Sequence, residues 1–371
     1  MRIVFCVFLV CSRNQISNNF VRGIIVLYFR VIVFAIILFS MPMLGTAESG
    51  KDRFHILLLN SYHPELSWTH NVIGGFQKEI RQCGLDVELT CEYLDSRRYP
   101  QLQSSMQNLI RQKLQNQQPD IVVVSDNDAY RFALRNRSTV FQDIPIVFCG
   151  INDFTPSLIE EDTNLTGVAE DQSILETIRL ALRLHPQTER IIVIGRTRVL
   201  ADRANRAAFM DRLEEIKKLT QVSFWDDCSA KKIAARLKTL DPHTLIVLNG
   251  LMEDKQGREM MYADTTRWVR RHSALPIYSF WEVYLGHGIV GGKLVSGRNQ
   301  GHLAARLAIR ILQGESAEHI PVVRGENANH YIFDAKELRR FKIPHSALPR
   351  EAKIINRPLT FYQKNKEWIW G

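Results

Sequence analysis

The feature that most constrains the fold is an alternation of short apolar runs with amphipathic stretches from residue 54 onward. The apolar runs predict strands, and the stretches between them, 71–84, 99–117 and 129–141, have helical patterns. Continuous apolar strands separated by helices of this length are typical of βαβ units, whose parallel sheet is covered on both faces. The strands predicted for this part of the chain are 54–60, 86–94, 120–126 and 144–150.

The same plan then restarts in the second half of the chain. Helical patterns near 199–219, 230–240 and 258–272 separate the predicted strands 190–196, 222–227, 244–250 and 275–281. The 371 residues suffice for two lobes of about 150 residues, each with its own core. We therefore predict an α/β protein of two doubly wound, Rossmann-like parallel-sheet lobes with a ligand cleft between them.

The first 47 residues differ from the rest in composition. They contain four arginines and no acidic residue, an apolar core from Val31 to Phe39, and small residues at Gly45 and Ala47. This pattern predicts a signal peptide over 1–47, cleaved after Ala47, and hence a periplasmic or other extracytoplasmic protein. The alternative is an N-terminal membrane anchor that is retained.

The charge of the remaining chain is mild. Removing the four leader arginines from 48 basic residues leaves 44 against 39 acidic ones, a net charge of +5. No run of Lys or Arg forms a nucleic-acid footprint, so nucleic acid is not an expected partner.

Signatures of common enzymes and metal sites are absent. The sequence contains no G-x-S-x-G, no H-E-x-x-H and no G-x-x-x-x-G-K-[ST] motif. The four cysteines after the leader lack C-x-x-C spacing, although Cys83 and Cys91 are close enough to form a disulfide or to remain two thiols. We expect no catalytic residue, no metal and no cofactor; an enzyme using Asp126, Asp128 or Glu282 is the lesser alternative.

Polar and aromatic residues cluster where the predicted strands end. Ligands bind beyond the carboxyl ends of strands in open parallel sheets. Helix capping explains many Asn, Asp, Ser and Gly residues at such positions. It does not explain five larger side chains, Tyr62, Trp68, Arg196, Trp281 and Glu282.

Several stretches occur in an order that resembles one family. They are "NSYHPELSWTHNVIGGFQKEI", "PDIVVVSDNDA", "IPIVFCGINDF", "NLTGVAEDQSILETIRLALRLHPQTERIIVIG" and "HGIVGGKLVSGRNQGHLAARLAIRILQGESAEHIPVV". Together they resemble the substrate-binding proteins of ABC transporters with the type I periplasmic-binding fold. The branch is one also found as the extracytoplasmic sensor region of bacterial histidine kinases. The resemblance covers residues 54 to 362.

The resemblance implies two lobes that close on a small molecule by hinge motion. It places the chain crossings between lobes near 166–168, 296–297 and 326–330. Lobe 1 is then 48–166 plus about 297–328, including the return helix 299–314, and lobe 2 is 167–296 plus about 329–371.

The resemblance also implies which side chains form the cleft. Tyr62, Trp68 and Trp281 would enclose an apolar part of the ligand. Arg196 would clamp a carboxylate, and Asp126 or Glu282 would pair with an amine, which fits an amino-acid-like or other small organic ligand. The full set of expected ligand-binding residues is Asn60, Ser61, Tyr62, His63, Trp68, Ser125, Asp126, Asn127, Gly150, Asp153, Glu170, Arg196, Asn249, Trp281 and Glu282.

The implied function is an exported solute-binding protein that feeds an ABC-type importer, with the permease as its partner. The alternative is the ligand-sensing component, or a truncated sensor region, of a histidine kinase or cyclase system. The aromatic ending "EWIWG" fits either a short end packed on lobe 2 or a membrane-proximal segment.

Overall fold

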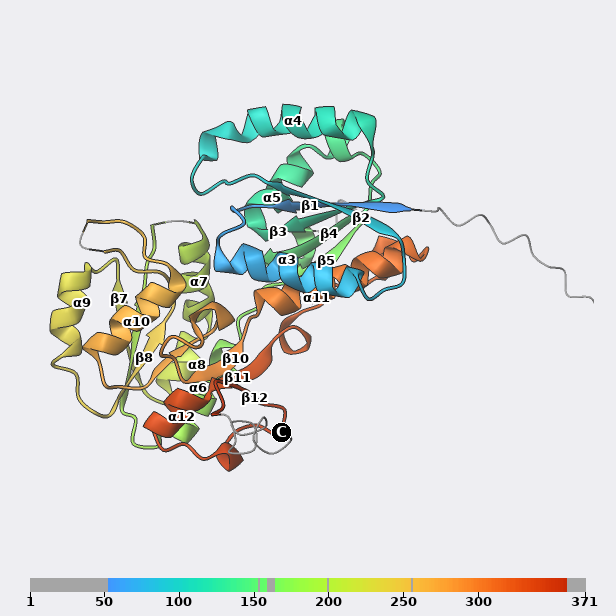
Figure 1. Ribbon diagram of the computed structural model, residues 1–371. Coiled ribbons are helices and arrows are strands. Elements are labelled where there is room, and N and C mark those ends of the chain that lie inside the picture. Colours follow the sequence, from blue (N-terminus) through green and yellow to red (C-terminus); the bar gives the residue numbers. More distant parts are fainter. Residues whose placement is uncertain (1–52, 153, 159–163, 199, 255, 359–371) are drawn as a thin grey trace, which may run out of the picture. The chain divides into compact units, whose positions relative to one another are not determined.

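A five-stranded parallel sheet forms the centre of the first lobe (Figure 1). The computed structural model describes residues 53–358 except 153, 159–163, 199 and 255. The strand order is β2-β1-β3-β4-β5, with every neighbouring pair parallel. The strands are β1 Phe54–Asn60, β2 Val87–Tyr93, β3 Ile121–Ser125, β4 Ile146–Ile151 and β5 Leu165–Ala169.

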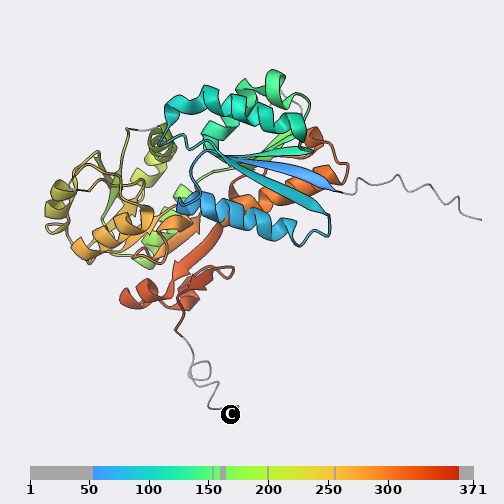
Figure 2. The same ribbon diagram turned by 45° about the horizontal axis from the view of Figure 1, so that its top comes forward.

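Helices cover both faces of this sheet, and the side chains of β1 show why. Successive strand residues point to opposite faces. Leu57 and Leu59 belong to the core under α4 and α5, whereas Ile56 and Leu58 belong to the core under α3 and α11. Figure 1 and Figure 2 both show α3 and α11 side by side on one face and α4 on the other. These helices are α3 Ser67–Ile80, α4 Gln103–Asn116, α5 Asp126–Arg135 and α11 Gly297–Leu312.

Two glycines allow α3 and α11 to lie in close contact. A Cβ at Gly75 would come within 1.9 Å of the Arg298 carbonyl oxygen, and one at Gly301 within 1.9 Å of the Val72 carbonyl oxygen. Any larger residue would force the helices apart. The return helix expected from the sequence therefore packs on the first sheet, more than 200 residues after α3.

The second lobe is built on a four-stranded parallel sheet of order β7-β6-β8-β9. Its strands are β6 Arg190–Gly195, β7 Gln221–Asp226, β8 Thr244–Leu248 and β9 Ile277–Ser279. The helices of this part are α6 Ile174–Leu184, α7 Leu200–Asp211, α8 Leu213–Lys217, α9 Ala230–Leu237, α10 Tyr262–His272 and α12 Ala335–Arg340.

A small mixed sheet adjoins the second lobe. Its strands are β10 Gly291–Leu294, β11 His330–Asp334 and β12 Lys353–Ile355; β10 and β11 are antiparallel, and β11 and β12 are parallel. Short helical turns complete the described chain: η1 Pro100–Leu102, η2 Arg137–Phe141, η3 Pro156–Leu158, η4 Glu282–Tyr284, η5 Ala317–His319, η6 Gly325–Asn327 and η7 His345–Ala347.

The α/β class and the two helix-flanked parallel sheets predicted from the sequence are confirmed. All eight predicted strands are present, but β5 and the small sheet were not predicted. The expected crossing at 166–168 lies inside β5, and the predicted helix 199–219 is divided into α7 and α8. The precise lobe boundaries stay a prediction.

Some expectations fall on residues outside the described part of the chain. These are the leader 1–47, the C-terminal residues 359–371 and Asp153. Within the described part, no helix is both long and apolar enough to cross a bilayer. Cys83, Cys91, Cys149 and Cys228 are free thiols, so the structure has no Cys83–Cys91 disulfide.

Candidate ligand-binding cleft

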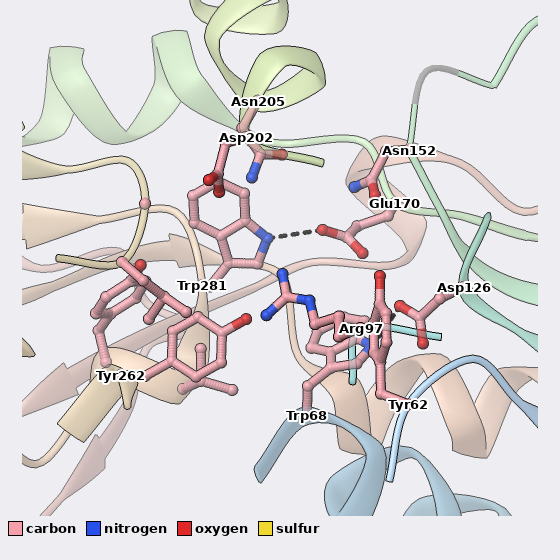
Figure 3. A pocket seen from close by; sticks show the side chains of 14 residues that line it. Tyr62, Trp68, Arg97, Asp126, Asn152, Glu170, Asp202, Asn205, Tyr262 and Trp281 are labelled. Atoms are coloured by element: carbon pink, nitrogen blue, oxygen red, sulfur yellow. Dashed lines mark hydrogen bonds between the residues drawn. The ribbon is translucent and has the colours of Figure 1, made fainter. Parts of the chain in front are cut away.

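A small pocket lies where the carboxyl ends of the two parallel sheets meet, and we call it the inner pocket. Its volume is about 60 Å³, enough for only a few water molecules. Aromatic and charged side chains dominate its lining (Figure 3). The lining residues are Tyr62, Trp68, Arg97, Asp126, Asn152, Glu170, Asp202, Asn205, Gly250, Leu251, Tyr262, Trp281, Val283 and Tyr284.

An indole–carboxylate pair forms the first-lobe side of the inner pocket. Trp68, in the first turn of α3, donates its indole N–H to Oδ1 of Asp126 at 2.7 Å. The hydroxyl of Ser125 donates to Oδ2 of the same carboxylate at 2.8 Å. Asp126 begins α5 with φ = 70°, a left-handed conformation that is costly outside glycine and is concentrated at functional sites.

Gly150 makes room for this pair. It is the last but one residue of β4 and has φ = 67°. A Cβ there would lie 3.1 Å from Oδ1 of Asp126 and 3.3 Å from the Trp68 ring. The role of Gly150 in the structure is therefore to permit the close approach of two pocket side chains.

A second indole–carboxylate pair joins the two lobes across the inner pocket. Trp281, just after β9, donates its indole N–H to Oε1 of Glu170 at 2.7 Å, as Figure 3 shows. Glu170 directly follows β5, at the start of the connection to α6. The backbone bridge between Trp281 and Val295 fixes the indole beside the chain that leads into α11. The two indoles thus come from different lobes, whereas Glu170, like Asp126, follows a strand of the first sheet.

Arg97 occupies the centre of the inner pocket. It lies in the loop after β2, and Figure 3 shows its guanidinium between the Trp281 and Tyr262 side and the Trp68 and Tyr62 side. The guanidinium carbon is 4.9 Å from the centre of the Tyr62 ring, within cation–π range. Nη1 donates to Oε1 of Glu259 at 3.1 Å, which is an ion pair between the two lobes.

Arg196, the predicted carboxylate clamp, does not line the inner pocket. Its guanidinium pairs with Oδ2 of Asp202 at 2.9 Å and with Oε2 of Glu259 at 2.7 Å. The Arg196 and Asp202 side chains are only 8% and 5% exposed. The hydrogen bonds from Nε and Nη2 stay within the second lobe, and they pair Arg196 with the buried carboxylate of Asp202 and the partly exposed carboxylate of Glu259.

The pocket is electrostatically acidic. Around it lie four carboxylates, Asp126, Glu170, Asp202 and Glu259, and two guanidiniums, Arg97 and Arg196. If all were ionised, these groups would sum to −2. The cavity therefore favours a cationic group over an anion.

Burial has shifted the protonation of these groups. Burial raises the pKa of Asp126 to about 7, although hydrogen bonds from Ser125 and Trp68 and the charge of Arg97 work against the shift. Burial also raises the pKa of Asp202, against the lowering effect of Arg196 and Arg97. Burial opposes the charge of Arg97, but Tyr262, Tyr62 and Glu259 outweigh it and keep the pKa of Arg97 above its ordinary value. Asp126 is thus poised to ionise near neutral pH.

Two wider hollows adjoin the inner pocket. The outer mouth has a volume of about 470 Å³ and shares Tyr62, Arg97 and Asn152 with the inner pocket. A groove of about 880 Å³ shares Asn152 and Glu170 with it. The Arg97 side chain stands on the boundary between the inner pocket and the outer mouth.

Of the residues predicted from the sequence, five line the inner pocket and two others line the outer mouth. The inner five are Tyr62, Trp68, Asp126, Glu170 and Trp281. Tyr62 also lines the mouth, together with His63 and Asn127.

The other predicted residues that the structure describes line neither the inner pocket nor the outer mouth. Ser61 donates to the Ser125 carbonyl at 2.7 Å and accepts from the Ala129 amide at 2.7 Å, while Asn60 donates to the Glu92 carbonyl at 3.2 Å. These bonds hold the strand ends of the first sheet. Asn249 is buried with its amide donating to the Asn205 carbonyl, and Glu282 begins η4 without lining the pocket.

Several lining residues were not predicted from the sequence. Arg97 follows β2, so the same strand-end rule, applied to 94–98, would have found it. Asn152 stands one residue beyond β4, in the predicted stretch Gly150 to Asp153. Asp202, Asn205 and Tyr262 lie on α7 and α10, where the sequence carries no signal that they face a cleft.

Two carboxylates, each hydrogen-bonded to an indole, and several aromatic faces converge on one enclosed volume. Such groups attract cations. Among the described residues, no group of three or more His, Cys, Asp or Glu side chains is placed to hold a metal ion.

No protein-family model matches the chain, and no curated protein matches it. Solved structures do. An ABC domain from Streptococcus pneumonia in complex with L-Trp is 17% identical, with a TM-score of 0.57 over 82% of this chain and 100% of that one. A ligand-free, open substrate binding protein with adhesive properties from Clostridium difficile is 16% identical, with a TM-score of 0.58 over 82% and 100%.

A periplasmic ribose ABC transporter protein from Conexibacter woesei is 12% identical, with a TM-score of 0.52 over 80% of this chain and 98% of that chain. These neighbours are described as binding or transport proteins, and they extend over the same two lobes. The fold implied by the sequence resemblance is confirmed: this chain has the type I periplasmic-binding fold of ABC transporter solute-binding proteins.

Proposed function

We propose that this protein is an exported solute-binding protein that captures one small, amino-acid-like molecule between its lobes and delivers it to an ABC-type importer. It releases the ligand unchanged and acts outside the cytoplasmic membrane. The ligand carries a protonated nitrogen and an apolar, preferably aromatic, body.

One observation carries this proposal: two indole–carboxylate pairs, Trp68–Asp126 and Trp281–Glu170, line one pocket, and their indoles come from different lobes. Each indole fixes the orientation of its carboxylate through a 2.7 Å hydrogen bond and offers an aromatic face beside it. A ligand nitrogen gains charge-assisted hydrogen bonds from the carboxylates, and its apolar part stacks on the indoles.

The position of the pairs also supports capture by closure. Asp126 comes from the first lobe, and Trp281 comes from the second. A ligand that touches both favours the closed arrangement by its differential affinity for that state. The L-Trp bound to the Streptococcus pneumonia domain combines an amine with an aromatic ring, which is the chemistry proposed for this pocket.

The test is a thermal-shift screen of the purified protein followed by calorimetry of the hits. The panel contains aromatic and basic amino acids, polyamines, ribose, myo-inositol and dicarboxylates. We expect stabilisation by compounds with a protonated nitrogen, with one molecule bound per chain and recovered unchanged. Stabilisation by a sugar or a dicarboxylate alone would contradict the proposal.

Variants localise the binding. Glu170→Gln and Asp126→Asn keep the shapes of the side chains but remove a charge each, and we expect at least about a tenfold loss of affinity for the hit. Asp264→Asn is the matched control, because Asp264 is an exposed carboxylate paired with Arg267 outside the cleft. Equal affinity in all three variants would place the binding site elsewhere.

A further inference from the structure

The guanidinium of Arg97 stands where a ligand would have to bind. It reaches the centre of the inner pocket, faces the Tyr62 ring at 4.9 Å and pairs with Glu259 of the opposite lobe at 3.1 Å. The remaining cavity of about 60 Å³ has no room for an organic molecule beyond a few heavy atoms. In this arrangement of the lobes, a larger ligand can enter the inner pocket only if this side chain moves.

Arg97 is held in a way that allows displacement. Its side chain is 25% exposed and that of its partner Glu259 is 37% exposed, so water can solvate both after separation. The outer mouth of about 470 Å³ begins at Arg97 and can receive the displaced side chain. Arg196, by contrast, is buried against Asp202, and the hollow that it lines has a volume of only about 100 Å³.

We propose that the place of the Arg97 guanidinium is the cation subsite of the cleft, and that Arg97 is an intramolecular plug which a guanidinium- or ammonium-bearing ligand replaces. This inference rests on the proposed function and specifies its substrate class. It makes Arg97 a specificity-determining residue. When Arg97 leaves the inner pocket, the pocket loses a positive charge, and a neutral or anionic ligand cannot replace that charge.

The surroundings of Arg97 favour replacement over a direct contact between Arg97 and a ligand carboxylate. A carboxylate entering the inner pocket would meet Asp126, Glu170 and Asp202. A cation meets these three carboxylates and the Tyr62 face against which Arg97 now lies. An amino-acid-like ligand would therefore direct its basic nitrogen inward and its carboxylate to the mouth, where the displaced Arg97 would lie.

The first experiment uses the guanidinium ion itself as the probe. Arg97→Ala leaves a vacancy between Tyr62 and Glu259, and we expect about 10 mM guanidinium chloride to raise its melting temperature relative to equal sodium chloride. The wild-type protein, whose subsite is filled, should show no such rise. Arg206→Ala is the matched control, since Arg206 also stacks on a ring, Phe224, and pairs with a carboxylate, Asp226, outside the pocket. A rise in Arg206→Ala as large as in Arg97→Ala, or no rise in Arg97→Ala, would overturn the proposal.

The second experiment measures affinity by calorimetry with agmatine, a guanidinium compound without a carboxylate. Removing the competing plug should make binding to Arg97→Ala up to about fivefold tighter than to the wild type, because the ligand no longer has to displace a side chain before it binds. Arg97→Gln keeps most of the bulk of the side chain and removes its charge, so it should also bind agmatine more tightly than the wild type. It replaces Arg97→Ala in the experiment if that variant does not fold. Arg97→Lys keeps a cation and should stay near the wild type.

Loss of affinity in Arg97→Ala and Arg97→Gln for the ligand found in the screen, without any gain for agmatine, would show that Arg97 binds the ligand directly and would overturn the plug. This outcome differs from failure of the proposed function, in which the wild-type protein binds no compound of the panel at all.

Discussion

The two arginines of the cleft are held in opposite ways. Arg97, on the first lobe, lies on an aromatic face and shares one partly exposed carboxylate of the other lobe. Arg196, on the second lobe, is buried between Asp202 and Glu259 of its own lobe. Both arginines form an ion pair with Glu259. This carboxylate therefore contacts Arg97, which can be displaced, and Arg196, which is fixed.

The two ion pairs differ in how much it costs to break them. A partly exposed ion pair contributes about 0–1 kcal/mol, so a ligand can replace it at little cost. Breaking a buried pair by removing one partner costs about 3–5 kcal/mol, because the other charge is left uncompensated. The arginine predicted from the sequence to bind ligand is structural, and the one that was not predicted lies in the pocket.

The largest expected effect is on stability when Arg196 is replaced. Arg196→Met should lower the free energy of unfolding by about 3–5 kcal/mol at neutral pH, since Asp202 stays buried without its partner. Urea denaturation measures the change. The double variant Arg196→Met with Asp202→Asn should recover most of the loss; a single-variant loss below about 1 kcal/mol would mean that Arg196 is no more fixed than Arg97.

The next effect concerns the second indole of the pocket. Trp281→Ala should weaken ligand binding by at least about 1–2 kcal/mol, because the ring faces the ligand and orients Glu170. Calorimetry with the hit from the screen measures it. Trp268→Ala is the control, as this ring stacks on His272 outside the cleft. If both variants bind like the wild type, Trp281 is no part of the site.

The pH dependence of binding should follow Asp126. Burial raises its pKa to about 7, and a cationic ligand needs the ionised form. Affinity should therefore fall as pH is lowered from 8 to 6, by at most about tenfold per unit, and Asp126→Asn should remove this dependence. An equally steep profile in Asp126→Asn would assign the titration to another group.

Protonation of Asp126 affects folding stability in the opposite direction to ligand affinity. Its folded pKa of about 7 is above the unfolded value of 3.8, so the folded protein binds the proton more tightly. Its contribution to stability becomes more favourable as pH falls from about 7 toward 3.8. Stability without ligand and affinity for ligand should thus move in opposite directions with pH.

The smallest expected effect is on stability when Arg97 is replaced. Arg97→Ala without ligand should change the free energy of unfolding by no more than about 1 kcal/mol, because both side chains of the Arg97–Glu259 ion pair are partly exposed to water. The urea experiment that is used for Arg196→Met measures it. A loss as large as that of Arg196→Met would show that Arg97 is a structural anchor and could not leave the pocket.

Much of the fold was predictable because continuous apolar runs such as Ile121–Ser125 identify buried parallel strands without tertiary information. β10 was missed because Gly291 and Gly292 hide its strand pattern, and their small size is required by tertiary contacts with Ile332 and Thr177. β12 is only three residues long and is fixed by its pairing with β11.

The site was only partly predictable for a related reason. Strand ends converge in any parallel sheet, so Tyr62, Asp126 and Trp281 could be named from their positions. Whether a charged side chain at such an end faces the cleft or a buried partner depends on the tertiary structure. Arg196 turns away because Asp202, 6 residues later on α7, and Glu259, 63 residues later, both fold against it.

Native mass spectrometry of the purified protein, before and after unfolding, shows directly whether the cleft holds a cationic ligand. We expect one small compound per chain, with a protonated nitrogen, retained by Asp264→Asn and lost from Glu170→Gln. Retention of the compound by Glu170→Gln at full stoichiometry, or release of a sugar or a dicarboxylate from the wild-type protein, would contradict it.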